Sequence, residues 1–434
     1  MAVSSGAQQV IALAITLYLL SIAALHFHHS QVEPPTSALA HDESTTLASP
    51  TRPLAVPLQS QSLSQPSLAG PSQLTQARLS TLAEARQEPG EAAPGASINE
   101  ASSISKRGVV AYAVTITRDG PYVDGAAVLG QGVRAAHQHH SAFDYALVAI
   151  VHPSVAKSRA PLKALGWRVI ERDLPFGLGE IANQDYARAV VTNGCCGHLE
   201  LLKLFAWSLT EYEWVVHLDM DSFVLKPMDE LFRTKNVSLF YTRDYNMAPG
   251  RPVLQAPVQG GFLCLRPDLK VHGTLWAIVK KGDFAKGRGW GGSGIGNFWG
   301  GMTIQGLIPY FVVKVMPASS AREVDRCVYN QMVDAAGDPT SKSKPLANMR
   351  VPNCRHASAE ETRNVHFTLC QKPWSCQRGH RQQLCMDYHR AWMGARRDLE
   401  AHLGIPVSIA CKKGKSGDSA YLPMDLHTLD RSGL

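Results

Sequence analysis

Two absences divide the sequence before any motif is considered. No Lys or Arg precedes Arg52, and no Phe, Trp, Tyr or Cys occurs between residues 30 and 107. The segment 30–107 also holds nine of the 26 prolines and is rich in Ser, Gln and Ala. Such a composition cannot bury enough apolar surface to offset the entropy lost on ordering the chain. Residues 30–107 are therefore predicted to form a disordered stem.

The remaining composition excludes other classes of protein. The formal net charge is only +7 over 434 residues, which is too weak a bias to argue for nucleic acid as a partner. Nine cysteines are too few for a scaffold built on disulfides, and their odd number leaves at least one without an intrachain partner. With 45% hydrophobic residues, the part of the chain after the stem is predicted to be globular.

The N-terminus carries one long apolar run, from Val10 to Leu25. As a helix this run reaches about 24 Å, which suits the thinner membranes of the early secretory pathway. Residues 1–29 are predicted to be a signal anchor with its transmembrane part at 8–26. The alternative is a cleaved signal peptide, for which Ala38-Leu39-Ala40 is a distant candidate site. The prediction is a single-pass type II protein of the Golgi or ER membrane, with its globular part in the lumen.

After the stem, short apolar runs alternate with segments of helical spacing. Parallel strands need long crossovers, so this alternation predicts an α/β domain with a mostly parallel, doubly wound sheet. Ligands of such sheets bind at the carboxyl ends of the strands. We assign residues 108–400 to this one domain and 401–434 to a C-terminal tail. The predicted strands are 108–117, 145–151, 167–171 and 214–218, and the predicted helices are 123–140 and 199–209.

Two carboxylates follow the strand 214–218 directly. Asp219 and Asp221 are at positions i and i+2 of an extended segment, so both side chains can reach one point. Neighbouring carboxylates favour a cation between them, and hard divalent ions prefer oxygen ligands. The alternative is a pair of solvated loop acids. Because the pair lies at the end of a buried strand, the metal-binding interpretation is preferred.

The stretch LELLKLFAWSLTEYEWVVHLDMDSFVLKPMDELF resembles the central part of glycosyltransferase family 8, the glycogenin-like retaining enzymes that use nucleotide sugars. The resemblance implies a single-domain, Rossmann-like fold of the GT-A type. It implies that Asp219 and Asp221 bind Mn²⁺, or Mg²⁺, on the diphosphate of a UDP-sugar donor. It also implies that Lys203, on the preceding helix, contacts the phosphates.

Three further stretches resemble the same family. VTITRDGPYVDGAAVLG implies that Thr117, Arg118, Asp119 and Tyr122 lie near uracil and ribose, although Tyr122 alternatively packs on the next helix. A tyrosine ring against a base is physically reasonable, because base–aromatic stacking is worth about 1–3 kcal/mol. In QGGF, the resemblance places Gln259 and Gly260 against the donor sugar.

In the last of these stretches, VHFTLCQKPW, the resemblance makes His366 the third metal ligand and Lys372 a β-phosphate contact. The alternative for His366 is a histidine of the apolar core. One imidazole beside two carboxylates favours manganese over magnesium or calcium.

One departure from the family pattern concerns the donor sugar. Gln305-Gly306 matches the family, but Ile304 stands where the family has an acid that contacts sugar hydroxyls. Asp244 is a candidate to replace that acid. The resemblance places Gln305 beside the anomeric carbon, and Gln305, Asp221 and Lys203 are the predicted catalytic residues.

The predicted function is a retaining glycosyltransferase that moves a hexosyl or related unit from a UDP-sugar to a glycan, lipid or protein acceptor. A front-face mechanism is expected, because no convincing carboxylate nucleophile is present. The alternative is a catalytically silent protein that binds UDP-sugar or nucleotide and keeps the fold.

Six cysteines lie in the last quarter of the sequence. In an oxidising lumen they are predicted to form disulfides that tie the C-terminal part to the core. The alternative is a zinc cluster of Cys370, Cys376, His380 and Cys385, whose spacing fits no standard pattern. The neighbours Cys195 and Cys196 are not expected to pair with each other. The six cysteines are Cys327, Cys354, Cys370, Cys376, Cys385 and Cys411.

Overall fold

The computed structural model describes residues 108–247, 252–336, 351–376, 382–408, 410–413 and 419–431. These residues all belong to one compact unit of the chain. The predicted anchor (1–29) and stem (30–107) lie outside the described residues. Among the helices that are described, none combines the length and apolar character needed to cross a membrane.

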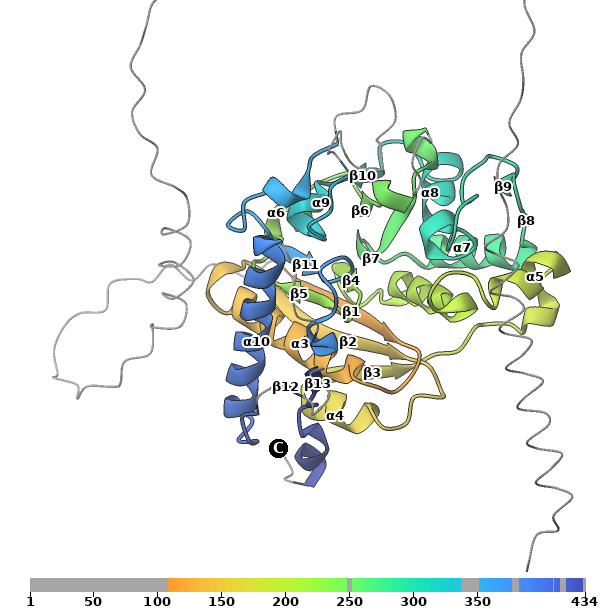
Figure 1. Ribbon diagram of the computed structural model, residues 1–434. Helices are drawn as coiled ribbons and strands as arrows, with labels where there is room; N and C mark the ends of the chain where they lie inside the picture. Colours follow the sequence, from red (N-terminus) through yellow and green to blue (C-terminus); the bar gives the residue numbers. More distant parts are fainter. Residues whose placement is uncertain are drawn as a thin grey trace, which may run out of the picture. The chain divides into compact units, whose positions relative to one another are not determined.

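A seven-stranded sheet forms the centre of the fold, in the order β10-β6-β7-β4-β1-β2-β3 (Figure 1). Every neighbouring pair is parallel except those that include β7, which runs antiparallel to β4 and β6. The predicted α/β fold with a mostly parallel sheet is therefore confirmed. The strands are β1 (Val109–Ile116), β2 (Asp144–Val151), β3 (Trp167–Glu171), β4 (Trp214–Leu218), β6 (Leu239–Arg243), β7 (Val258–Leu265) and β10 (Ala321–Glu323).

Both faces of the sheet are covered, and alternate residues of β1 show how. Val110, Tyr112 and Val114 belong to one apolar cluster, whereas Ala111 and Ala113 belong to the other. Successive side chains of a strand point to opposite faces, so a strand between two layers is apolar throughout. This explains why the predicted strands 108–117, 145–151 and 214–218 are mostly apolar runs, whereas β3, at the edge of the sheet, contains Arg168 and Glu171.

The first cluster includes side chains of α3, α4 and α10, and α10 lies alongside α3 (Figure 1). The second includes side chains of α5, η2, α7 and α8. The α-helices are α3 (Tyr122–His140), α4 (Arg159–Ala164), α5 (Gln184–Val190), α6 (Asp229–Phe232), α7 (Leu269–Lys281), α8 (Ile304–Lys314), α9 (Arg326–Tyr329) and α10 (Gln383–His402). The 3₁₀ helices are η1 (Leu178–Glu180), η2 (Gly197–Ser208), η3 (Tyr245–Met247), η4 (Val253–Gln255), η5 (Cys354–His356), η6 (Pro373–Ser375) and η7 (Leu426–Arg431).

Three small antiparallel pairs complete the described structure. The one that matters for the site joins β5 (Ser222–Val224) to β11 (Asn364–His366), with Ser222 opposite His366. The others join β8 (Phe284–Ala285) to β9 (Gly289–Trp290), and β12 (Cys411–Lys413) to β13 (Ser419–Tyr421).

One prediction about local structure is wrong. The segment 199–209 was expected to be a helix with a single apolar face. Instead η2 is a 3₁₀ helix in which all residues from Glu200 to Trp207 are buried. The physical reason is its position, since η2 packs against β1 and β4 of the sheet and against α7 and α8 as well.

The C-terminal residues pack into the same core as α3. Met424, Leu426 and Leu429 are buried there. The carboxylate of the buried Asp124 accepts hydrogen bonds from the Tyr421 hydroxyl (2.6 Å) and the backbone N–H of Met424 (2.9 Å).

Three disulfides tie down this part of the chain, which confirms the prediction that the six C-terminal cysteines form disulfides. They join Cys327 to Cys354, Cys370 to Cys385 and Cys376 to Cys411. The alternative of a zinc cluster is therefore wrong, because its three cysteines are all consumed in disulfides.

Candidate metal and nucleotide site

The candidate site lies at the side of the sheet formed by the carboxyl ends of β1, β4 and β6. Thr117, Asp219 and Asp244 come just after these three parallel strands. Because β7 is antiparallel to β4 and β6, its first residues reach the same edge. The backbone N–H of Asp219 donates to the carbonyl of Gly261, on β7, at 3.3 Å. Residues distant in sequence thus converge at the place expected for a ligand.

Asp219, Asp221 and His366 form the centre of the site. One potential ligand atom from each lies within 4.8 Å of the others. Nε2 of His366 is 3.4 Å from Oδ1 of Asp221 and 3.8 Å from Oδ2 of Asp219. The pairing of β5 with β11 produces this arrangement, because it places His366 opposite the residue that follows Asp221. The structure therefore brings together the three predicted metal ligands.

The imidazole of His366 is held by two neighbours. Its Nδ1 lies 3.1 Å from Oδ1 of Asn330, whose amide nitrogen donates to the Thr242 hydroxyl at 2.9 Å. Since an amide oxygen can only accept, Nδ1 of His366 donates this hydrogen bond to Asn330. The Thr368 hydroxyl lies 2.7 Å from Nε2. Metal-binding histidines commonly have their second nitrogen fixed in this way.

Lys203 provides positive charge on one side of the site. Its ammonium group is buried and lies 2.7 Å from Asp219 and 3.5 Å from Glu200, and it donates to the carbonyl of Gly260 at 3.1 Å. Burial alone would lower the pKa of Lys203. The nearby carboxylates of Asp219 and Glu200 outweigh burial and raise that pKa well above its usual value. Lys203 is therefore a cation at neutral pH.

On the other side, Lys372 forms an ion pair with Asp221. Burial opposes the charge of both groups, yet the ion pair raises the pKa of Lys372. Burial likewise raises the pKa of Asp221, but His366 and Lys372 together hold it below its usual value. Each carboxylate of the pair thus has its own lysine.

Behind the site, His217 is fully buried on β4. Its Nε2 lies 2.8 Å from the hydroxyl of Thr115 on β1. Burial, and then the charge of Lys203, lower the pKa of His217 to about 3. His217 is therefore neutral and adds no charge beside the lysine.

Gly261 permits the close approach of β7 to the metal ligands. A Cβ atom at this position would overlap Cε1 of His366, and it would lie 2.8 Å from Nδ1 of His366 and 3.0 Å from Oδ2 of Asp219. These distances are shorter than normal van der Waals contacts. A residue with a side chain at position 261 would therefore displace a ligand.

Two of the four residues expected near uracil and ribose line a cavity. Thr117 and Arg118 contribute to a hollow of about 420 Å³, together with residues of the segment 191–199. That volume is in the range of small-molecule pockets. The other two predicted residues, Asp119 and Tyr122, do not line it.

The carboxylate of Asp119 is occupied by the turn that precedes α4. It accepts from the backbone N–H groups of Ala156, Lys157 and Ser158 and from the Ser158 hydroxyl, at 2.7–3.1 Å. Tyr122 packs edge-on against Trp374, with ring centroids 5.7 Å apart, and the guanidinium of Arg118 lies 5.5 Å from its ring. Both residues thus have structural partners, and their nucleotide contacts stay predictions.

The two predicted glutamines are buried at the same edge. Oε1 of Gln259 accepts from the backbone N–H of Gly261 at 2.7 Å. Gln305 is at the start of α8, with its Nε2 3.3 Å from the sulfur of Met247. Ile304 is fully buried in the apolar cluster that η2 shares with α8. No carboxylate stands at position 304, so any acid that contacts the sugar must come from elsewhere.

Asp244 is the acid that the sequence suggested for this gap. It is buried, and burial, followed by the charge of Asp334, raises its pKa to about 6. Asp334 itself forms a buried ion pair with Arg326 at 3.0 Å and accepts from the amide of Asn246 at 3.2 Å. Asp244 therefore has an unusually high proton affinity among the aspartates beside the site.

Sequence reasoning missed several polar residues of the site. Glu200 is buried between Lys203 and the hydroxyl of Thr303, and Asn330 orients His366. Glu200 stood inside a quoted motif, one helical turn before Lys203, which was a usable signal. Thr303 and Asn330 belong to no motif, and only the structure reveals their roles.

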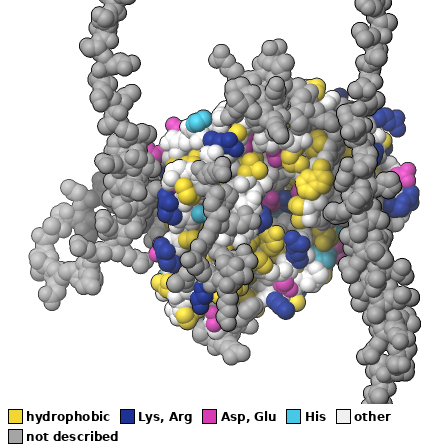
Figure 2. Space-filling model, in the orientation of Figure 1, with side chains coloured by type: hydrophobic (Ala, Val, Ile, Leu, Met, Phe, Trp, Pro, Cys, Tyr) yellow, Lys and Arg dark blue, Asp and Glu magenta, His cyan; other side chains and the backbone are white. Residues whose placement is uncertain are grey.

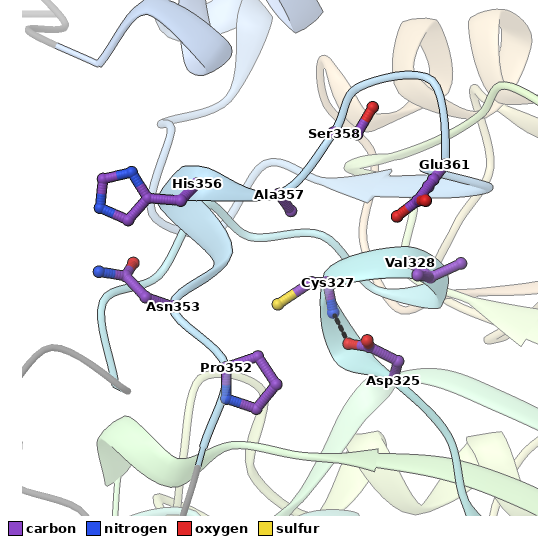
Figure 3. A pocket seen from close by; sticks show the side chains of 9 residues that line it. All are labelled: Asp325, Cys327, Val328, Pro352, Asn353, His356, Ala357, Ser358 and Glu361. Carbon is purple, nitrogen blue, oxygen red and sulfur yellow. Dashed lines mark hydrogen bonds between the residues drawn. The ribbon is translucent and has the colours of Figure 1, made fainter. Parts of the chain in front are cut away.

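The rest of the described surface shows no comparable grouping of the predicted site residues. On the face drawn in Figure 2, Lys and Arg side chains are scattered among other types. A second cavity, of about 260 Å³, lies beside the disulfide that joins Cys327 and Cys354. Figure 3 shows Asp325, His356 and Glu361 around it, with the N–H of Cys327 donating to Asp325 at 2.8 Å. None of the predicted site residues lines this cavity.

Similar solved structures are of glycosyltransferases. They include the WbbM bifunctional glycosyltransferase (TM-score 0.41, 14% identity, 66% of this chain and 49% of that one). GlyE of Streptococcus pneumoniae has a TM-score of 0.39 and 13% identity, with 70% of this chain and 66% of that one covered. The galactosyltransferase LgtC with donor and acceptor sugar analogs has a TM-score of 0.36 and 14% identity, with 65% and 95% covered.

The curated relative is glycogenin-2 of Homo sapiens, to which the chain is 35% identical over 163 residues. The match covers 37% of this chain and 28% of glycogenin-2, so the chain spans less than a third of that relative. No protein-family model matches. The predicted resemblance to glycogenin-like glycosyltransferases is confirmed over this part of the chain.

Proposed function

We propose that this protein is a metal-dependent glycosyltransferase that uses a UDP-sugar as donor. The observation that carries the proposal is the convergence of Asp219, Asp221 and His366 at the strand ends, with Lys203 and Lys372 on the two carboxylates. The two carboxylates and the imidazole are suited to bind a divalent cation. The two ammonium groups are suited to bind a diphosphate. The partial similarity to glycogenin-2 supports the same reaction class.

The three side chains that could bind a metal ion fit a transition metal. Two carboxylates and a neutral imidazole suit Mn²⁺ better than Ca²⁺, whose ligands are oxygens, and Mg²⁺ is the second choice. Asp219, Asp221 and His366 would hold the ion, with Asn330 fixing the ring of His366. When bound, the ion would neutralise charge on the diphosphate of the leaving UDP.

The two lysines would act on the same charge. In the structure each ammonium group is paired with one carboxylate of the site. A metal ion would compete with the lysines for these carboxylates, and a diphosphate would provide the lysines with new anionic partners. Lys203 and Lys372 would then stabilise the negative charge that develops as the glycosidic bond breaks, which is electrostatic stabilisation by preorganised groups.

We further infer that the sugar is transferred with retention of configuration. Gln305 lies at the start of α8 on the same edge and would face the anomeric carbon, as the family resemblance predicts. Asp244 would supply the hydroxyl contact that Ile304 cannot make. A glycan, lipid or protein is the proposed acceptor class.

The proposed compartment is the lumen of the Golgi or ER, with the chain anchored through residues 1–29. The three disulfides support an oxidising compartment, where such bonds persist.

The test is release of UDP by the full-length chain from a panel of UDP-sugars with Mn²⁺ and an acceptor mixture. We expect turnover on at least one donor and loss of turnover in the double variant Asp219→Ala/Asp221→Ala. The matched control is Glu211→Ala/Glu213→Ala, an exposed acidic pair with the same i, i+2 spacing that precedes β4, whereas Asp219 and Asp221 follow it. Undiminished turnover in the Asp219/Asp221 variant would contradict the site assignment.

Two further readouts separate the finer claims. The anomeric configuration of the product, measured by NMR, decides retention. Calorimetric binding of UDP with no turnover on any donor would instead support the catalytically silent alternative.

A further inference from the structure

Two neighbouring thiols line the proposed nucleotide cavity. Cys195 and Cys196 are exposed and unbonded, and their sulfur atoms are 3.2 Å apart. Both contribute to the wall of the 420 Å³ cavity, together with Thr117 and Arg118 at the end of β1. Among the described cysteines, six form disulfides and the remaining free one, Cys264, is fully buried in the sheet. Cys195 and Cys196 are therefore the thiols that a solute can reach.

The backbone around the pair is an unusual turn. Gly194 and Gly197 flank it with φ angles of +67° and +59°, a region that favours glycine. A Cβ atom on Gly197 would overlap the carbonyl of Val191, so a side chain is excluded there. The turn holds both thiols on the cavity wall.

A bond between the two sulfurs would be strained and easily reversed. Adjacent Cα atoms are about 3.8 Å apart, below the roughly 4.4–6.8 Å that disulfides normally span. Strained, exposed disulfides are the labile ones that are reduced readily. The reduced pair in the structure agrees with the expectation that Cys195 and Cys196 are not a permanent disulfide. The 3.2 Å separation of their sulfurs leaves only a short movement for closure.

The turn is also connected to the metal site. The helix η2 begins at Gly197 and carries Glu200 and Lys203, the buried pair next to Asp219. A Cβ on Gly194 would lie 3.3 Å from Cα of Gly300, in the loop that precedes Gln305. Closure of a disulfide would twist the Cys195–Cys196 peptide. This twist would move the cavity wall directly and would also displace the first residues of η2.

We propose that Cys195 and Cys196 are a redox-sensitive dithiol whose oxidation to a disulfide weakens the binding of a nucleoside diphosphate in the cavity. The identity of the ligand rests on the proposed function, whereas the dithiol chemistry does not. The oxidant is a small disulfide of the glutathione type.

The step is an exchange of thiols and disulfide. One thiolate attacks a sulfur of the small disulfide, forms a mixed disulfide and releases one small thiol. The second cysteine then attacks the bonded sulfur, closes the Cys195–Cys196 bond and releases the other small thiol. The protein loses two electrons and two protons, and the small disulfide gains them. The first attack is made by whichever of the two thiols is ionised, and the other thiol, 3.2 Å away, can donate a hydrogen bond to that thiolate.

The experiment compares the full-length chain reduced and after treatment with oxidised glutathione. Peptide mass spectrometry should find the peptide with both cysteines two hydrogens lighter and resistant to alkylation. Calorimetric titration with UDP and Mn²⁺ should show an affinity roughly tenfold lower after oxidation, within the usual range of coupling between sites. Reduction should restore it.

Three variants sharpen the result. Cys195→Ser and Cys196→Ser should each bind UDP with an affinity that closure can no longer change, whereas Cys264→Ser should respond like the unmodified chain. Two results would overturn the inference. One is glutathione adducts without a closed disulfide, and the other is a closed disulfide with unchanged UDP affinity. If the reduced chain fails to bind UDP, the proposed function fails, and with it the effect of the dithiol on nucleotide binding. Peptide mapping then still decides whether the dithiol closes.

Discussion

Nδ1 of His366 lies 3.1 Å from Oδ1 of Asn330, whereas Nε2 is the ring nitrogen near the two aspartates. Because Asn330 is itself fixed by Thr242, the ring has one orientation, with Nε2 toward Asp219 and Asp221. The site is therefore arranged before any ligand binds, by a residue that would not touch the metal.

Replacement of Asn330 should weaken metal binding without removing a ligand. For Asn330→Ala we expect affinity for Mn²⁺ to fall about 10- to 100-fold, as is usual when the residue behind a metal ligand is lost. Calorimetric titration of the metal measures this. Asn364→Ala is the control, because this buried asparagine donates to the carbonyl of Tyr329 and not to His366. Equal affinities in Asn330→Ala and the unmodified chain would contradict the orientation argument.

The close approach of β7 gives a steric test. In Gly261→Ala the added methyl group would overlap the ring of His366, so we expect Mn²⁺ affinity to fall by at least about tenfold while the fold persists. The control is Gly273→Ala on α7, where a Cβ meets nothing within 4 Å. That control should instead stabilise the protein by about 0.5–1 kcal/mol, because alanine favours a helix. Metal titration and urea unfolding report the two effects, and normal metal affinity in Gly261→Ala would refute the geometry.

Lys203 should matter for stability even without metal. Lys203→Met leaves the buried Glu200 without its cation, and breaking a buried pair typically costs about 3–5 kcal/mol. Urea unfolding in the presence of a chelator measures the loss. In Glu200→Gln/Lys203→Met, which removes both charges, part of the stability should return. Lys280→Met, at an exposed pair with Glu180, should leave the stability nearly unchanged.

Asp244 predicts a specific pH dependence of stability. Its pKa in the folded protein is about 6, above the value of about 3.9 for an unfolded aspartate. The stabilising contribution of the protonated group is complete below about pH 4 and is lost as the pH rises through about 6. The lost stability is on the order of 3 kcal/mol for a shift of this size.

The variant Asp244→Asn should remove this loss, so that it is more stable than the unmodified chain at pH 7 and similar to it at pH 4. Urea unfolding with a chelator, repeated across this pH range, tests the claim. Asp398→Asn, at an exposed position of α10, should keep the profile of the unmodified chain. If the free energy of unfolding of Asp244→Asn changes with pH in the same way as that of the unmodified chain, Asp244 does not ionise as described.

Sequence alone predicted the strands better than their directions. The strand at 214–218 was predicted with its observed bounds, because a continuous apolar run marks a strand covered on both faces. The strand at 167–171 also has its predicted bounds, although only Trp167 is buried in it. The strand β7 was not predicted, and nothing in its sequence indicates that it runs antiparallel to β4 and β6, since its eight residues are all buried like those of β4. The one-sided helix predicted at 199–209 failed for a related reason, because apolar spacing does not reveal how many layers surround a segment.

The candidate site was predictable where it rests on motifs. Asp219, Asp221, His366, Lys203 and Lys372 were named from the resemblance, and the structure brings them together. Asn330 and Thr303 were missed because a single polar residue in a loop has no pattern until its partner is known. For Asp119, the same carboxylate can bind a ligand or the backbone of the turn before α4, and sequence does not distinguish the two.

The distance along the chain between the two halves of the site has a consequence for biosynthesis. Asp221 and Lys372 are 151 positions apart, and His366 belongs to the later half. A ribosome that has made Asp221 must still add 151 residues, with β6, β7, β10 and β11 among them, before Lys372 can reach it. Metal affinity should therefore appear only near the end of translation, and a chain truncated before β11 should keep the aspartates without binding the ion.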